Sequence, residues 1–156
     1  MAQYRYVIKN VDKYAGDARR VFARSKWELY YMQALDGSPM VRKWTSEPKN
    51  LNIAYLSPLD KKVHQYWPDF LVQYNDGSIE ILEIKPLKES LAEKTQNIHD
   101  KIALLKNAAK WQAADRFAKS IGGRFRVITE KNLFQKKVTK APRRAKVTSK
   151  PRGTVK

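Results

Sequence analysis

The first regular pattern of hydrophobic and polar positions along the chain is a helical one, in the first quarter of the sequence. Ser25-Lys26-Trp27-Glu28 is a capping box, in which a serine and a glutamate bond the free backbone groups of a helix start. Apolar residues at helical spacing follow it: Leu29, Tyr30, Met32 and Leu35. We expect this helix to begin at Ser25, or as early as Asp17, and to end at Asp36-Gly37-Ser38-Pro39.

A second helical pattern lies further along the chain. Its apolar face is marked, at spacings of three, four and multiples of four, by Ile98, Ile102, Leu105, Ala109 and Phe117. Ser90-Leu91-Ala92-Glu93 is a candidate capping box, so we expect the helix to start at Ser90 or Thr95 and to run to Ile121. Gly122-Gly123 should end it.

Strand-like segments fill the stretch between the two helical patterns. Segments 41–44, 51–56, 64–74 and 79–84 are rich in β-branched and aromatic residues, and turn signals separate them. A last short strand is expected over 125–129. The order helix, antiparallel strands, helix, strand indicates an α/β or α+β sandwich with one central sheet, and we expect an α/β fold whose mixed sheet is flanked by helices.

The charge of the chain is strongly positive. Lys and Arg number 32 against 15 for Asp and Glu, which gives a formal net charge of +17. Such an excess attracts a polyanion, usually nucleic acid, although a membrane surface or an acidic protein would also fit. Every charged residue from Lys136 to Lys156 is basic, so we expect residues 136–156 to form a disordered tail. Such a tail would bind phosphates without reading sequence, or would be solvated with no specific role. Residues 1–135 form the expected domain.

Several function classes are excluded by what the sequence lacks. There is no cysteine, so disulfides, zinc fingers, iron–sulfur clusters and thiol catalysis are excluded. Two histidines argue against a histidine-based zinc site. No apolar run approaches the roughly 20 residues of a membrane span, and no signal peptide or Walker motif is present. We therefore expect a soluble intracellular protein with no membrane partner.

Two acidic residues and a lysine form the candidate site. Glu83 and Lys85 are two apart in a strand pattern, so they project from the same face. Asn75-Asp76-Gly77 favours a three-residue hairpin loop, which places Tyr74 opposite Ser78 and Asp69 opposite Glu83. A two-residue loop would shift the register by one and put the two carboxylates on opposite faces.

Paired carboxylates on one face predict a metal site. Opposed like charges destabilise a sheet, and a bridging divalent cation removes that cost. Carboxylate oxygens suit Mg²⁺, for which Mn²⁺ can substitute, and the bound metal would activate water for phosphodiester hydrolysis. Lys85 would orient or deprotonate that water, or neutralise developing charge. The simpler alternatives are a Glu83–Lys85 ion pair and a strand-end role for Asp69.

These motifs resemble those of a known superfamily. Tyr66-Trp67-Pro68-Asp69-Phe70 followed by Glu83-Ile84-Lys85-Pro86 resembles the signature of PD-(D/E)xK nucleases. Together with Arg24-Ser25-Lys26-Trp27-Glu28 and Lys13-Tyr14-Ala15-Gly16-Asp17, the set is similar to TnsA-type transposon endonuclease domains. It is more similar still to the head-completion nucleases of T-even-type tailed phages. The resemblance covers residues of roughly 10 to 130.

The resemblance implies a fold and an activity. The fold would be restriction-endonuclease-like, and the activity that of a Mg²⁺-dependent endonuclease on double-stranded DNA. Asp69, Glu83 and the backbone carbonyl of Ile84 would bind the metal, with Glu28 joining them. Glu28 is equally well explained as the glutamate of the capping box, and both roles are compatible. The setting would be phage head completion after DNA packaging, with head or portal proteins as partners, in the host cytoplasm and the virion head.

Other settings and residues keep open alternatives. The chain could be a non-catalytic DNA-binding head protein, or a transposon-end or repair nuclease. Glu80 should point to the other face, toward solvent or a partner, and His64 should be structural or DNA-facing. The tryptophans, Trp27, Trp44, Trp67 and Trp111, are expected in the core or at its rim. Lys106 and Lys110 should lie on a solvated helix face, with a phosphate contact as the alternative.

Overall fold

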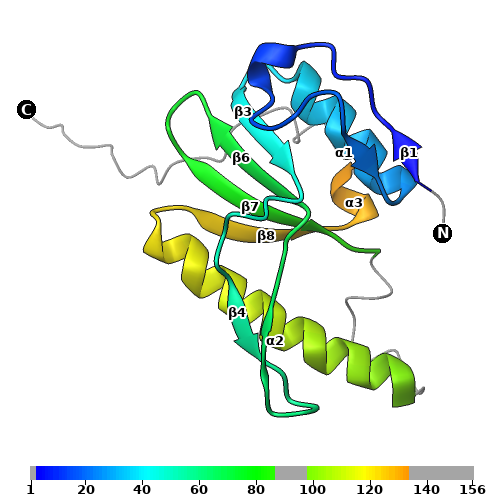
Figure 1. Ribbon diagram of the computed structural model, residues 1–156, viewed down its shortest axis with the longest axis vertical. Helices are drawn as coiled ribbons and strands as arrows, with labels where there is room; N and C mark the ends of the chain where they lie inside the picture. Colours follow the sequence, from blue (N-terminus) through cyan, green and yellow to red (C-terminus); the bar gives the residue numbers. More distant parts are fainter. Residues whose placement is uncertain (1–2, 87–97, 134–156) are drawn as a thin grey trace, which may run out of the picture.

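The computed structural model describes residues 3–86 and 98–133 (Figure 1). The elements follow in chain order as β1 (Tyr4–Arg5), η1 (Val11–Lys13), β2 (Phe22–Ala23), α1 (Lys26–Gly37), β3 (Val41–Ser46), β4 (Ala54–Leu56), β5 (Val63–Gln65), β6 (Phe70–Tyr74), β7 (Ile79–Ile84), α2 (Ile98–Ser120), β8 (Arg124–Ile128) and α3 (Glu130–Leu133). Residues 136–156, expected as a basic tail, and the candidate capping box at 90–93 lie outside the described residues.

A mixed four-stranded sheet forms the centre of the molecule. Its strand order is β3-β6-β7-β8, with antiparallel pairs β3–β6 and β6–β7 and a parallel pair β7–β8. In Figure 1, α1 and α3 lie on one side of this sheet, and α2 with β4 lies on the other. The predicted restriction-endonuclease-like α/β fold, a mixed sheet between helices, is confirmed. No helix in the described ranges is both long and apolar enough to span a membrane.

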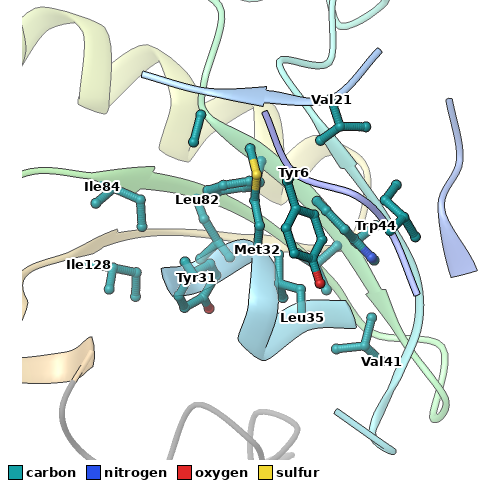
Figure 2. Close-up of a cluster of buried hydrophobic side chains, with 14 of the residues drawn as sticks. Tyr6, Val21, Tyr31, Met32, Leu35, Val41, Trp44, Leu82, Ile84 and Ile128 are labelled. Carbon is teal, nitrogen blue, oxygen red and sulfur yellow. The ribbon is translucent and has the colours of Figure 1, made fainter. Parts of the chain in front are cut away.

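The larger apolar core lies between α1 and the sheet. Figure 2 shows Tyr31, Met32 and Leu35 of α1 beside Trp44, Leu82 and other side chains of this cluster. Met32 and Leu35 were predicted on the apolar face of this helix, whereas Tyr31 was not, and the predicted Tyr30 is 46% exposed. Trp44 is 1% exposed and contacts the ring of Tyr14 edge-on, with 4.7 Å between centroids. The expected core position of Trp44 is therefore confirmed.

The capping box that begins α1 has one expected bond and one altered bond. Ser25 is the N-cap, and its Oγ accepts a hydrogen bond of 3.1 Å from the backbone N–H of Glu28. The Glu28 side chain accepts in turn from the N–H of Arg24 at 3.1 Å, one residue before the cap. The helix does not extend back to Asp17, whose carboxylate instead pairs with Arg19. It ends at Gly37, as predicted.

The β6–β7 hairpin has the predicted register. Phe70 pairs with Leu82 and Gln73 with Ile79, which is the register that a three-residue loop between Tyr74 and Ser78 produces. The Tyr74 N–H donates to the carbonyl of Ser78 at 2.9 Å, and Gly77 has φ +89°, in the left-handed region that favours glycine. The local turn chemistry thus decides which side chains share a face of the sheet.

Replacing Gly77 with Val should lower the free energy of unfolding by about 1–2 kcal/mol, because a β-branched residue is strained at positive φ. The matched control is Gly37→Ala. Open space surrounds a Cβ at both positions, but Gly37 ends a helix without positive φ. Chemical denaturation of both variants measures the difference. Equal stability of the two variants would contradict the role given to the left-handed turn.

The predicted strand 64–74 is wrong as a single strand. It is divided into β5 and β6, and residues 66–69 between them belong to neither strand. Pro68, which has no N–H to donate, lies in this break. β5 pairs only with β4 in a separate hairpin, with Tyr55 opposite His64. Asp69 therefore stands one residue before β6 instead of inside a strand.

The apolar face predicted for α2 is partly wrong. Ile98 and Leu105 are 63% and 56% exposed, whereas Ala113, Ala114 and Ala118 are buried against the sheet. The helix packs through small side chains in its second half, and the spacing of the larger apolar residues does not indicate this face. Its end is as predicted: Gly122 has φ +77°, and the Gly123 N–H donates to the Ala118 carbonyl at 2.8 Å.

Glu80 is on the face opposite Glu83, as predicted, but the expectation of a solvent or partner-facing role is wrong. Its side chain is 0% exposed. Tyr74 Oη donates to Oε1 at 2.6 Å, and the guanidinium groups of Arg124 and Arg126 approach Oε2 to 2.6 and 2.7 Å. The parallel pairing of β7 with β8 brings both arginines to this carboxylate. A buried charge with this set of partners serves the fold.

Candidate active site

Asp69 is held at the point where the chain enters the central sheet. Its carbonyl accepts from the N–H of Glu47 at 2.8 Å, which fixes the backbone before β6. Its side-chain Oδ2 accepts from the N–H of Ile84 at 2.8 Å, so the carboxylate reaches across to β7. Because Phe70 pairs with Leu82, Asp69 is level with Glu83. The predicted apposition of the two acids is confirmed.

Glu83 is near the end of β7, on the face that α2 covers. The hydroxyl of Tyr66 donates to Glu83 Oε1 at 2.5 Å. Tyr66 belongs to the smaller apolar cluster with Tyr55, Ile81 and residues of α2, so the hydrogen bond fixes Glu83 from that layer. Lys85 is the first residue after β7, and its backbone N–H donates to the Ile128 carbonyl at 2.9 Å. Glu83 and Lys85 are thus anchored by neighbours on two sides.

Burial disfavours the ionised form of both acids. Burial raises the pKa of Asp69 well above its usual value, and the nearby carboxylates of Glu83 and Glu28 raise it further. Burial also raises the pKa of Glu83, although the Tyr66 hydroxyl, Lys85 and Lys110 oppose the shift. The ionised pair is costly in the absence of a further cation, as expected for a site built to hold one.

Glu28 lies within electrostatic range of these residues while it also takes part in the helix cap. Burial raises the pKa of its carboxyl, the Arg24 N–H and guanidinium lower it, and the carboxylate of Glu47 raises it. Arg24 Nη2 lies 2.8 Å from Glu47 Oε2, so this arginine joins the two glutamates. Neither Arg24 nor Glu47 was predicted to take part in the site, although Arg24 belongs to the motif that contains Glu28. The capping role of Glu28 is confirmed, and its support of a metal stays a prediction.

The donor set fits one mode of metal binding. Within 3–86 and 98–133, no group of three or more histidine, aspartate or glutamate side chains is placed to hold an ion. Mg²⁺ commonly uses only one or two carboxylates and keeps several waters. Asp69 and Glu83 suit that mode, with the Ile84 carbonyl as a further oxygen of the same β-strand end. Three-carboxylate binding through Glu28 would need movement of that side chain.

A second lysine reaches the site from α2. Lys110 Nζ lies 5.9 Å from the ring centroids of both Tyr55 and Tyr66. Burial lowers the pKa of Lys110; nearby Lys106 and Lys85 lower it too, and Glu83 opposes them. The sequence favoured a solvated helix face for Lys106 and Lys110. The buried alanines of α2 determine which face of the helix packs on the sheet, and so where Lys110 lies. The spacing of large apolar residues does not indicate that face.

The remaining aromatic candidates divide between core and surface. Trp67 is 55% exposed, so the prediction of a core or rim position is wrong for it, while Trp27 and Trp111 are partly buried. His64 is exposed, with Nε2 2.8 Å from Asp60 Oδ2, and its ring stacks on Tyr55 at 5.7 Å. It is a surface residue of the β4–β5 hairpin.

Comparison with known proteins gives two matches that include this site. The family model of the TnsA-like endonuclease N-terminal domain matches residues 38–130, which contain Asp69, Glu83 and Lys85 but not Glu28. The chain is also 31% identical over 139 residues to the head completion nuclease of Enterobacteria phage T4. That alignment covers 83% of this chain and 91% of the phage protein. The resemblance to PD-(D/E)xK nucleases is thereby confirmed, and the chain belongs to the TnsA-like endonuclease family.

Proposed function

We propose that this nuclease is a metal-dependent endonuclease of double-stranded DNA that acts in phage head completion after DNA packaging. The observation that carries the proposal is the apposition of Asp69 and Glu83 with Lys85 beside them. The similarity to the phage T4 head completion nuclease over most of both chains supports the setting. It also suggests head or portal proteins as partners, and the host cytoplasm and virion head as locations.

Each residue of the site has a role in the proposed hydrolysis. Asp69 and Glu83 would hold Mg²⁺ or Mn²⁺, with the Ile84 carbonyl as a third oxygen and Glu28 in support. When bound, the metal supplies a Lewis acid and lowers the pKa of a bound water. Lys85 orients the attacking water or neutralises charge on the phosphate. Tyr66 holds the Glu83 carboxylate in place through the 2.5 Å hydrogen bond.

Double-stranded DNA suits the charge of the protein. The net charge of +17 favours binding to the phosphate backbone, which depends on salt and little on sequence. The basic run from Lys136 to Lys156 adds to this attraction. Charge alone would serve a DNA-binding head protein equally well. Paired carboxylates that face a phosphate are what favour catalysis, since they would weaken a protein that only binds DNA.

The test is conversion of supercoiled plasmid by the full chain in Mg²⁺. We expect nicked or linear product, loss of that product when EDTA removes the metal, and recovery when Mg²⁺ or Mn²⁺ is added back. Glu83→Ala should cut no DNA, because half of the carboxylate pair is gone. Binding without cutting in either metal would support the structural head-protein alternative. A Glu83→Ala variant that cuts as well as the natural protein would overturn the site.

A further inference from the structure

Lys110 is positioned more closely than a surface lysine needs to be. It projects from α2 and is half-buried, with its Nζ equidistant from the rings of Tyr55 and Tyr66. Both rings belong to the apolar layer beneath α2, and Tyr66 is the residue that binds Glu83. Contact with aromatic rings restrains the ammonium group and keeps it within electrostatic range of Glu83.

The charges around Lys110 are unfavourable for a purely structural role. Lys106 precedes it by one helical turn, and like charges at that spacing destabilise a helix. Lys85 adds a third positive group from the end of β7. In the described part of the chain, no carboxylate forms an ion pair with Lys110 within 4.0 Å, and Glu83 attracts it only from further away. A lysine held in place by two aromatic rings, with other lysines nearby and no ion pair of its own among the described residues, suits an anion supplied from outside.

We propose that Lys110 binds a backbone phosphate of the DNA, as a second cation of the active site supplied by α2. Its Nζ would donate to a non-bridging phosphate oxygen, while Lys85 stands on the strand side of the same carboxylates. Tyr55 and Tyr66 form the support that keeps the ammonium group in reach. The inference rests on the proposed function, because it assigns a substrate contact to that site.

The test measures phosphate contacts by the salt dependence of DNA binding. Lys110→Gln removes the charge, and Lys110→Arg keeps it. Lys119→Gln is the matched control, since Lys119 lies on the same helix, is 72% exposed and already pairs with Asp115 at 3.0 Å. Fluorescence anisotropy of a labelled duplex gives Kd over a range of KCl, with Ca²⁺ in place of Mg²⁺. Thermal unfolding of each variant checks the fold.

We expect Lys110→Gln to weaken binding about 5-fold or more and to reduce the slope of log K against log salt by about 0.9, the value for one lost phosphate contact. Lys110→Arg should keep the slope, and Lys119→Gln should match the natural protein. An unchanged slope in Lys110→Gln would overturn the inference and leave the nuclease assignment intact if the natural protein cuts plasmid. A natural protein that neither binds nor cuts duplex DNA would overturn both.

Discussion

Replacing Asp69 with Asn is expected to abolish DNA cleavage while making the metal-free protein more stable. The loss should be 1,000-fold or more, because the amide cannot supply the charge that holds the metal in the proposed site. The gain in stability follows from the raised pKa of Asp69, which shows that burial and the carboxylates of Glu83 and Glu28 penalise its ionised form. A gain on the order of 1 kcal/mol would raise Tm by about 2–4 °C in a domain of this size.

The pH dependence of this gain has a definite sign. The pKa of Asp69 is higher in the folded protein than in the unfolded chain, so its contribution to stability is present at low pH and lost as pH rises. Thermal unfolding in EDTA should therefore show Asp69→Asn above the natural protein at pH 7. The difference should shrink toward zero as pH falls to about 4, near the usual pKa of aspartate. Mg²⁺ should raise Tm only in the natural protein.

Asp60→Asn is the matched control for Asp69→Asn. Asp60 is an exposed aspartate in the β4–β5 hairpin, and hydrogen bonds from the Lys62 N–H and the His64 ring lower its pKa. Its neutralisation should leave cleavage unchanged and should not raise Tm. If Asp69→Asn were less stable than the natural protein at pH 7, the hydrogen bond from the Ile84 N–H would outweigh the repulsion. The picture of a strained carboxylate pair would then be wrong.

Replacing Glu80 with Ala should have the opposite effect on stability, a loss of about 3 kcal/mol. Glu80 is fully buried, and its removal leaves the hydroxyl of Tyr74 without its acceptor and Arg124 and Arg126 without their shared carboxylate. Urea denaturation at pH 7 measures the loss. Glu80→Gln should lose less, because an amide oxygen still accepts from Tyr74.

Glu83→Gln is the comparison that makes the Glu80 result informative. Glu80 and Glu83 are two acids of one strand on opposite faces. Arginines neutralise Glu80, whereas burial raises the pKa of Glu83. Neutralising Glu83 should not destabilise the metal-free protein, although it should end cleavage. A Glu80→Ala variant as stable as the natural protein would show that the arginine cluster is dispensable.

The parts predicted correctly from the sequence depend on neighbours along the chain. Asn75-Asp76-Gly77 determined the register because a turn acts on the residues beside it, and the register then placed Asp69 opposite Glu83. The Ser25 cap was equally local. The mixed sheet followed from the order of the elements, since a strand after a long helix joins the sheet in parallel to an earlier strand.

The parts that were missed depend on packing between distant segments. Glu80 alternates like a solvent-facing residue, and only the pairing of β7 with β8 brings Arg124 and Arg126 to it. Lys110 was expected on a solvated face. The helix α2 instead turns its alanines to the sheet, and this rotation brings Lys110 beside Tyr55 and Tyr66. The strand over 64–74 was divided because β5 found a partner in β4, which no local pattern showed.

The strand order has a consequence for how the protein behaves in solution. An outer strand offers free backbone groups to any other strand it meets, and charged side chains on that strand discourage the encounter. On the β3 side, the Ala15 N–H donates to the Trp44 carbonyl at 2.9 Å, so the chain's own N-terminal segment covers the edge. On the β8 side, Arg124 and Arg126 are partly exposed. We therefore expect the arginines that neutralise Glu80 inside the fold also to discourage edge-to-edge association of the protein in concentrated solution.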